Sequence, residues 1–470
     1  MYKKKAHVHF LGIGGIGMSG IATVLKQQGY TISGCDTDLE QSSVRQLQEI
    51  GCAIYRGNNS PECARAGADV LVYSSAVTQD HPEIVAARAR GIPAIPRALM
   101  LAELMRTKYS IAVAGSHGKT TTTSLVSHIL IEAGLDPTVI IGGHLKSISH
   151  NARCGTGDFL VAEADESDRS LVSLHATIGL VTNIDLEHLE TYKDLDDIKK
   201  TFDQFLHCLP FYGLAVICDD DPGARSLLPI SHVRTITYGT TPRADLYATD
   251  LTLRPDSCHF VVHRNGTTLG PVTLAMPGAH NALNALGAIA LAHALEVPFS
   301  QIQKALASFK GVERRFSFNG SYRGAQLFDD YGHHPNEIHH VLTVARARAK
   351  GKLIVIFQPH RYTRTHMLWD DFVSVFCEGG IDHLVLTDIY PASELPIPGI
   401  TSKRLARAID TRKPPCCVDY IPFENTFEQL RGALDRIVQE GDLVLLLGAG
   451  KVNTMAPILL TPPSNIKECA

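Results

Sequence analysis

A loop rich in glycine and threonine could bind the phosphates of a nucleotide. It reads Gly-Ser-His-Gly-Lys-Thr-Thr, follows an apolar run and precedes a helical stretch. In loops of this kind backbone amides surround the phosphates, a lysine contacts the transferred phosphoryl group and a threonine hydroxyl binds Mg²⁺. The alternative is a helix cap rich in serine and threonine, which the complete strand, loop and helix pattern disfavours. The residues that we predict to contact ATP are Gly115, Ser116, His117, Gly118, Lys119, Thr120 and Thr121.

A second glycine-rich turn lies near the start of the chain. Gly12, Gly14, Gly15 and Gly17 separate an apolar run from a helical stretch, and Asp36 ends the next apolar run. Glycines let backbone amides approach a diphosphate at a helix N-terminus, and an acid about 20 residues later suits a ribose hydroxyl. The pattern predicts a nucleotide diphosphate but does not distinguish NAD from a UDP-sugar. A tight turn without a ligand is the alternative.

Acidic residues and a histidine follow two later apolar runs. The segment 163–168 reads Glu-Ala-Asp-Glu-Ser-Asp, and His188 ends the segment 182–188. Carboxylates at the carboxyl end of a strand beside a phosphate loop suit a divalent cation, and a neutral imidazole can complete the shell. Glu163 is the best metal candidate. For the other three acids a solvated loop is an equally good interpretation. For His188 by itself an ordinary surface or core residue is the better interpretation, and its position after a strand end makes the two interpretations about equal.

Arginine and histidine gather in the last third of the chain. Arg314 and Arg315 come first, the segment 329–335 reads Asp-Asp-Tyr-Gly-His-His-Pro, and Arg361 and Arg364 follow the next apolar run. Arginines can bind a carboxylate or phosphate through paired hydrogen bonds, and either histidine could accept a proton from an amine. The alternative is a set of loop residues with surface ion pairs.

A further pair, Asn281 and Asn284, stands near the start of a helical stretch. The two amides could bind a purine edge or cap the helix, and the sequence leaves both possibilities open.

The elements that must position these residues alternate between strand and helix. Apolar runs predict strands at 6–11, 31–35, 70–74, 110–114, 159–162, 177–182, 214–218, 325–328, 353–357, 384–387 and 443–447. Amphipathic stretches predict helices at 16–28, 44–50, 83–90, 120–133, 281–294, 335–349 and 427–439, and the segment 238–275 reads as short strands with turns. This βα rhythm is typical of parallel sheets covered by helices.

The length and composition agree with a multidomain globular protein. The chain has 470 residues, 44 basic and 48 acidic side chains, and 44% hydrophobic residues. At about 100–200 residues per domain this indicates three domains, which we place at 1–107, 108–312 and 313–470. The fold class is therefore α/β, with Rossmann-like first and last domains around a central P-loop domain.

The same composition excludes several classes of protein. Intrinsic disorder does not fit so apolar a chain, and a basic excess for coating nucleic acid is absent. The 11 cysteines show no C-x-x-C spacing, which argues against a disulfide framework or a zinc site. No apolar run approaches the roughly 18 residues of a membrane span. We expect a cytoplasmic protein without membrane or nucleic-acid partners.

Two nucleotide sites and a late cationic block together predict a reaction. ATP that serves to join a carboxylate to an amine acts through an acyl phosphate, which the amine then attacks with release of phosphate. The residues thus indicate an ATP-dependent ligase, but they do not identify its substrates. A nicotinamide-dependent dehydrogenase would explain the first glycine turn and leave the phosphate loop without a use. A non-catalytic P-loop regulatory module would not need the late cluster.

Nine sequence segments together resemble the Mur ligase family over essentially the whole chain. They lie at 11–20, 74–76, 115–123, 163–168, 182–188, 277–284, 311–316, 329–335 and 357–365. The resemblance implies three domains, which bind a UDP-sugar, ATP and an amino acid in that order. The implied reaction joins L-alanine to the carboxylate of UDP-N-acetylmuramate with release of ADP and phosphate, as a step of peptidoglycan precursor synthesis. A related ligase that recycles a preformed tripeptide is the alternative.

The resemblance also implies roles for single residues. The UDP-sugar would lie at Gly12, Gly14, Gly15, Gly17, Asp36, Ser74 and Ser75. Lys119, Arg315 and His333 would be catalytic, with Lys119 and Arg315 on ATP phosphates and Asn281 and Asn284 near adenine. Thr120 and Glu163 would bind one Mg²⁺, and Glu163 and His188 a second. Tyr331, His333, Arg361 and Arg364 would surround L-alanine, with the arginines on its carboxylate and His333 close to its amine.

Overall fold

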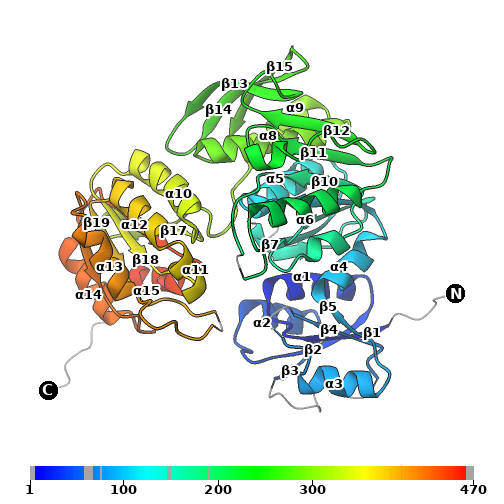
Figure 1. Ribbon diagram of the computed structural model, residues 1–470, viewed down its shortest axis with the longest axis horizontal. Coiled ribbons are helices and arrows are strands. Elements are labelled where there is room, and N and C mark those ends of the chain that lie inside the picture. The colour runs from blue at the N-terminus through cyan, green and yellow to red at the C-terminus, as the bar shows by residue number, and fades with distance from the viewer. Residues whose placement is uncertain are drawn as a thin grey trace. The chain divides into compact units, whose positions relative to one another are not determined.

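The computed structural model describes residues 6–57, 67–74, 77–145, 150–188, 190–392 and 394–461. These residues form three sheets, of five, ten and six strands, with helices packed against them (Figure 1). The predicted α/β class with three sheet-containing domains is confirmed. The chain forms two compact units, one of residues 1–252, 258–275 and 279–312, and one of residues 253–257, 276–278 and 313–470.

The first sheet is wholly parallel and has the strand order β3-β2-β1-β4-β5. Its strands are β1 (His7–Leu11), β2 (Thr31–Asp36), β3 (Ala53–Arg56), β4 (Val70–Tyr73) and β5 (Ala94–Pro96). Its helices are α1 (Ile16–Gln27), α2 (Ser42–Glu49), α3 (Pro82–Ala89) and α4 (Arg97–Met105). The sequence patterns did not predict β3, β5 or α4. Six of the nine residues of α4 are buried, so its pattern lacks the polar face that marks an amphipathic helix.

A buried polar contact fixes α3 to the first sheet. Glu83 on α3 is fully buried, and its carboxylate accepts a hydrogen bond from Cys35 Sγ at 3.2 Å. His9 Nε2 lies 3.5 Å from the other oxygen of this carboxylate. Because His9 and Cys35 project from the neighbouring strands β1 and β2, one side chain on α3 joins both strands.

We expect Glu83→Ala to lower the free energy of unfolding by about 2–4 kcal/mol, because it removes a buried acceptor and leaves a cavity. Urea denaturation followed by circular dichroism measures the change. The matched control is Glu103→Ala on α4, because the carboxylate of Glu103 forms an exposed ion pair with Arg106 at 3.2 Å. The control is expected to lose less than about 0.5 kcal/mol. Equal losses in the two variants would contradict a stabilising role for Glu83.

The central sheet has the strand order β15-β14-β13-β12-β11-β10-β6-β9-β7-β8. Its strands are β6 (Tyr109–Ala114), β7 (Thr138–Leu145), β8 (His150–Arg153), β9 (Phe159–Glu163), β10 (Ile178–Val181), β11 (Leu214–Cys218), β12 (Arg234–Gly239), β13 (Leu246–Leu253), β14 (Cys258–Arg264) and β15 (Thr267–Leu274). Its helices are α5 (Lys119–Glu132), the 3₁₀ turn η1 (Ser170–Ser173), α6 (Leu195–His207), α7 (Pro222–Arg225), α8 (Ala279–Ala294) and α9 (Phe299–Ser308).

The order of the central strands brings three loops together. β6 lies between β10 and β9, and both pairs are parallel. The loops after these three strands therefore leave the same edge of the sheet. They carry the phosphate loop, the acidic segment 163–168 and the segment 182–188.

The third sheet has the strand order β16-β17-β21-β18-β19-β20 and lies in the second compact unit. Its strands are β16 (Ser317–Tyr322), β17 (Ala325–Asp330), β18 (Leu353–Phe357), β19 (His383–Leu386), β20 (Cys417–Tyr420) and β21 (Leu443–Leu447). Its helices are α10 (Pro335–Arg348), α11 (Tyr362–Met367), α12 (Trp369–Glu378), α13 (Ser402–Thr411), α14 (Glu428–Ile437), η2 (Val452–Thr454) and α15 (Met455–Leu460). A hydrophobic cluster covers each face, so the central strands are buried on both sides.

None of the helices in the described part of the chain is long and apolar enough to cross a membrane.

Candidate active site

The phosphate loop is shaped by two glycines with positive φ. Gly115 has φ +137° and Gly118 has φ +81°. A Cβ atom on Gly115 would overlap Thr182 Oγ1, and one on Gly118 would overlap Asn284 Oδ1. Larger residues would therefore be excluded by both conformation and space. α5 begins directly after Gly118, which directs its first amides towards the loop.

Lys119 is folded back onto the loop in this structure. Its Nζ donates to the carbonyl oxygens of Gly115 at 2.6 Å and Ser116 at 3.1 Å, and to Glu166 Oε1 at 2.7 Å. Burial opposes the charge on Lys119, but the carboxylates of Glu166 and Glu187 outweigh it and raise its pKa. The lysine is thus a half-buried cation at the position where a phosphate would bind.

The loop after β10 holds the phosphate loop in place. Asn183 Oδ1 accepts a hydrogen bond from the backbone amide of His117 at 2.7 Å. His117 Nε2 lies 3.1 Å from Asp185 Oδ2, and Asp185 N donates to Ser116 Oγ at 2.8 Å. The sequence pattern pointed only to the histidine of this loop, and Asn183 and Asp185 were not predicted as supports of the phosphate loop.

His188 lies among acidic side chains. Its Nε2 is 3.4 Å from Glu166 Oε1 and 3.7 Å from Glu187 Oε2. Burial disfavours the charged ring of His188, but hydrogen bonds with Glu166 and Glu190 outweigh this effect and raise its pKa to about 9. Ligand atoms of Glu166, Glu187 and His188 all lie within 4.8 Å of one another.

This group of side chains fits a divalent cation. Glu166 and Glu187 are buried, and Glu166 Oε2 has no hydrogen-bond partner among the described residues. Carboxylate oxygens are the ligands that Mg²⁺ prefers, and a ring nitrogen that binds a metal must first lose its proton. The sequence analysis left Glu166 open between a solvated loop and a functional acid. Its burial between Lys119 and His188 excludes the solvated loop.

The other two predicted metal ligands lie beside β7. A Cβ atom on Gly142 would lie 2.5 Å from Glu163 Oε2, and one on Gly143 would lie 2.9 Å from Thr120 Cγ2. The structure thus brings Thr120 and Glu163 to consecutive glycines on one strand. Glu166, Glu187 and Glu190 are the acidic residues that we find next to His188. The predicted pairing was with Glu163.

The two predicted adenine contacts lie next to the phosphate loop. Asn281 and Asn284 are buried on the first turns of α8. Asn284 Nδ2 lies 3.4 Å from Asn281 Oδ1, and Asn284 Oδ1 faces Gly118. Asn284 therefore lies at the phosphate loop itself, a contact that the sequence left open.

The first glycine turn joins β1 to α1. Gly12 has φ +80°, and its amide donates to the carbonyl oxygen of Cys35 at 2.9 Å. Gly14 N donates to Asp36 Oδ2 at 2.8 Å. A Cβ atom on Gly12 would lie 3.6 Å from Ser74 Cβ. Asp36 thus supports the turn directly, which the sequence analysis did not foresee.

Of the other residues predicted for this site, Gly15 N lies 3.4 Å from the carbonyl oxygen of Gly12. Gly17 lies in the first turn of α1. Ser75 lies outside the described residues.

The second compact unit gathers the late cluster. The guanidinium of Arg315 lies 5.5 Å from the ring centre of Tyr331, and Arg315 Nη1 lies 3.7 Å from Glu337 Oε1. The rings of Tyr331 and His333 meet edge to face at 5.4 Å. The ring centre of His360 is 5.7 Å from that of His333, so three separate segments of sequence meet here.

Arg361 and Arg364 lie at the start of α11. Arg364 Nη1 lies 3.2 Å from His360 Nδ1, and Arg361 Nη1 lies 3.6 Å from Glu394 Oε1. Burial and the charges of Arg364, Arg361 and Arg314 lower the pKa of His360 to about 3. His360 is therefore neutral at physiological pH and adds no charge to this cationic group.

His333 has a defined tautomer. Its Nδ1 lies 3.1 Å from the carbonyl oxygen of Tyr331, which can only accept, so the neutral ring carries its proton on Nδ1. Burial lowers its pKa well below the usual range, although Glu337 opposes this shift. The ring is neutral, and Nε2 is left as a proton acceptor.

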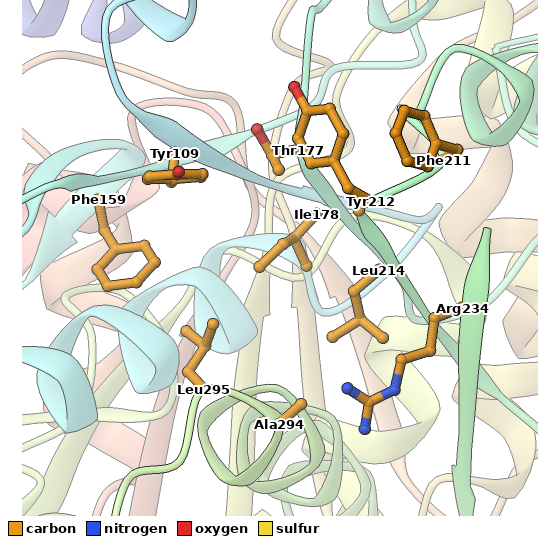
Figure 2. Close-up of a pocket in the computed structure, with 11 residues that line it drawn as sticks. Tyr109, Phe159, Thr177, Ile178, Phe211, Tyr212, Leu214, Arg234, Ala294 and Leu295 are labelled. Carbon is orange, nitrogen blue, oxygen red and sulfur yellow. The ribbon is translucent and has the colours of Figure 1, made fainter.

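A hollow of about 530 Å³ lies at the opposite edge of the central sheet. Tyr109, Phe159, Ile178, Leu214 and Arg234 line it from the amino ends of five strands (Figure 2). The phosphate loop follows the carboxyl end of β6, so this hollow is not the candidate active site.

Family models match the chain in three consecutive parts. The Mur ligase family catalytic domain matches residues 7–109, the Mur ligase middle domain 113–292 and the Mur ligase glutamate ligase domain 314–450. A protein of Geobacter sp. (strain M21), named UDP-N-acetylmuramate--L-alanine ligase, is 50% identical over 470 residues, with all of both chains covered. The chain belongs to the Mur ligase family.

Further relatives of this Mur ligase agree. The protein of the same name from Geobacter sulfurreducens is 49% identical, with 96% of each chain covered. The crystal structure of UDP-N-acetylmuramate-alanine ligase from Thermotoga maritima has a TM-score of 0.80 at 27% identity and covers 97% of this chain and 98% of that one. Mur ligases are ATP-dependent, so the predicted ligase class and nucleotide are confirmed at the level of the family.

Proposed function

We propose that this Mur ligase joins L-alanine to the carboxylate of UDP-N-acetylmuramate, with conversion of ATP to ADP and phosphate, in the synthesis of a peptidoglycan precursor. Support comes from relatives of that name at about 50% identity over the whole chain. The observation that carries the mechanism is the contact of Lys119 with the buried carboxylate of Glu166 beside His188. Since ATP is the energy source, the cytoplasm is the expected compartment, and the proposed domain boundaries lie near residues 107 and 312.

The first step transfers the γ-phosphoryl group of ATP to the sugar carboxylate. A carboxylate oxygen attacks the γ-phosphorus, the bond to the β-phosphate oxygen breaks, and ADP leaves. The amides of the phosphate loop and Lys119 bind the phosphates and neutralise the charge that develops on them. Arg315 is proposed to contact the same γ-phosphate, and Asn281 and Asn284 to contact adenine.

The residues proposed to hold two Mg²⁺ ions are Thr120, Glu163 and His188, and the structure favours adding Glu166 and Glu187. When bound, Mg²⁺ would neutralise charge on the triphosphate.

The second step joins the amine to the acyl phosphate. The ammonium first loses one proton to become the attacking amine. The amine nitrogen attacks the carbonyl carbon and the carbon–oxygen bond to phosphate breaks, after which the nitrogen loses a second proton and keeps one hydrogen in the amide. Arg361 and Arg364 are proposed to bind the carboxylate of L-alanine, with Tyr331 beside it. His333 is proposed as the proton acceptor because the contact of its Nδ1 with the carbonyl oxygen of Tyr331 leaves the lone pair of the neutral ring on Nε2.

A phosphate-release assay tests this function. With ATP, Mg²⁺ and UDP-N-acetylmuramate present, we expect kcat/KM to be at least about tenfold higher for L-alanine than for larger amino acids, because one extra methylene group discriminates by this order. Glycine and L-serine complete the panel. The tripeptide L-alanyl-γ-D-glutamyl-meso-diaminopimelate tests the recycling ligase. Faster turnover with the tripeptide, or phosphate release that needs no UDP-sugar, would contradict the proposal.

A further inference from the structure

An ion pair joins the first sheet to the acidic loop of the central sheet. Arg97 is the first residue of α4, and its Nη2 lies 3.1 Å from Asp165 Oδ2 in the loop after β9. The two side chains are 18% and 41% exposed. Both residues lie in the first compact unit.

Arg97 also packs on the first turn of α1. A Cβ atom on Gly17 would lie 3.0 Å from Arg97 Nη1 and 3.2 Å from Arg97 Cδ, so the arginine occupies the space that any larger residue would need. The same turn is held by Asn151 on β8, whose Nδ2 donates to the carbonyl oxygen of Ile16 at 2.6 Å. The proposed diphosphate site is therefore attached to the central sheet at two points.

The acidic loop passes this attachment on to the phosphate loop. Asp165 contacts Arg97, and the next residue, Glu166, accepts a hydrogen bond from Lys119 Nζ at 2.7 Å. Glu166 is buried, and the hydroxyl of Tyr192 donates to its carbonyl oxygen at 2.5 Å, so this part of the loop has little freedom to move independently. A contiguous series of contacts thus runs from Gly17 through Arg97, Asp165 and Glu166 to Lys119.

We propose that Arg97 is a positioning residue that fixes the glycine turn relative to the phosphate loop through Asp165 and thereby couples binding of the UDP-sugar to binding of ATP. This inference rests on the proposed function. A coupling free energy acts equally in both directions, so each nucleotide changes the affinity for the other by the same factor. Loss of the ion pair should reduce that factor without removing either binding site.

The experiment measures binding of adenylyl imidodiphosphate with Mg²⁺ by calorimetry, with and without saturating UDP-N-acetylmuramate. We expect the affinity of the wild-type protein for the ATP analogue to change by about fivefold or more when the sugar nucleotide is present. This change in affinity, the ratio of the two dissociation constants, should fall towards one in Arg97→Ala, in Asp165→Asn and in the double variant. The fall should be equal in the three proteins, because both substitutions break the same contact. Arg97→Lys keeps a charge near Asp165 and should recover part of the factor.

The matched control is Arg106→Ala, which removes an arginine from the other end of α4 where the side chain is 54% exposed. It should keep the wild-type factor. Three results would overturn the inference: a wild-type factor of one, an unchanged factor in Arg97→Ala, or losses in the double variant that multiply those of the single variants. Failure of the proposed function would appear separately, as a wild-type protein that releases no phosphate with UDP-N-acetylmuramate, ATP and L-alanine.

Discussion

Replacing Lys119 by alanine is expected to lower the rate of ADP formation by about a thousandfold or more. The ammonium lies in a buried loop and would neutralise charge on the migrating phosphoryl group, and loss of one such contact typically reduces kcat by 10²–10³-fold or more. The affinity for UDP-N-acetylmuramate, measured by calorimetry without ATP, should change by less than about threefold, because its proposed site lies on the glycine turn of the first sheet. Equal loss of both properties would argue against separate sites.

The variant also removes the cation that faces Glu166, which is buried. Breaking a buried pair by removal of one partner costs about 3–5 kcal/mol, so Lys119→Ala by itself mixes a catalytic and a structural effect. The double variant Lys119→Ala/Glu166→Gln separates them, since it should recover stability in urea denaturation but not activity. A matched control is Lys108→Ala, because the ammonium of Lys108 donates to the carbonyl oxygens of Gly155 and Gly157. It should lose stability and keep a kcat close to that of the wild type.

Replacing Arg361 by alanine is expected to raise the apparent KM for L-alanine by about 30- to 150-fold and that for ATP by less than threefold. A charge-assisted hydrogen bond from a guanidinium to a carboxylate contributes about 2–3 kcal/mol, which corresponds to this range. Arg361 has φ +70°, but arginine and alanine are equally restricted there, so the substitution adds little backbone strain. Initial rates with varied L-alanine and varied ATP measure both constants.

Two further variants make the test of Arg361 specific. Arg361→Lys keeps the charge but not the paired donors, so its KM should lie between those of the wild type and Arg361→Ala. Arg346 on α10 is a control of matched exposure, since its side chain is 36% exposed against 37% for Arg361 and it also faces a carboxylate, that of Asp382. Arg346→Ala should leave both KM values unchanged. A similar rise in KM for ATP and L-alanine in Arg361→Ala would contradict the assignment.

Local patterns predicted most of the secondary structure that positions the site. Strands β1, β6, β9, β10, β18 and β21 are short apolar runs bounded by glycine or polar residues, and burial on both faces of a sheet makes such runs easy to identify. Helix α4 escaped prediction because most of its surface is buried, which removes the polar face on which the periodicity depends.

The order of strands and the direction of each side chain could not be predicted in the same way. The segment 163–168 offers four acids within six residues, and no local rule says which of them turns inwards. In the structure Glu166 faces Lys119 and His188, while Asp165 faces Arg97 at the start of α4. These partners are distant in sequence, so only the packing of β9 beside β6 and of α1 and α4 against the central sheet brings them together.

By itself the sequence determined the types of chemistry that this protein can perform, because the glycines, Lys119, the acids and the late arginines stand after apolar runs whose pattern is local. The tertiary structure decided which of these groups meet, because contacts between loops depend on strand order and on burial, and neither property is encoded within a short segment. The contacts of Glu166 with Lys119 and of Asp165 with Arg97 were decided by the tertiary structure in this way.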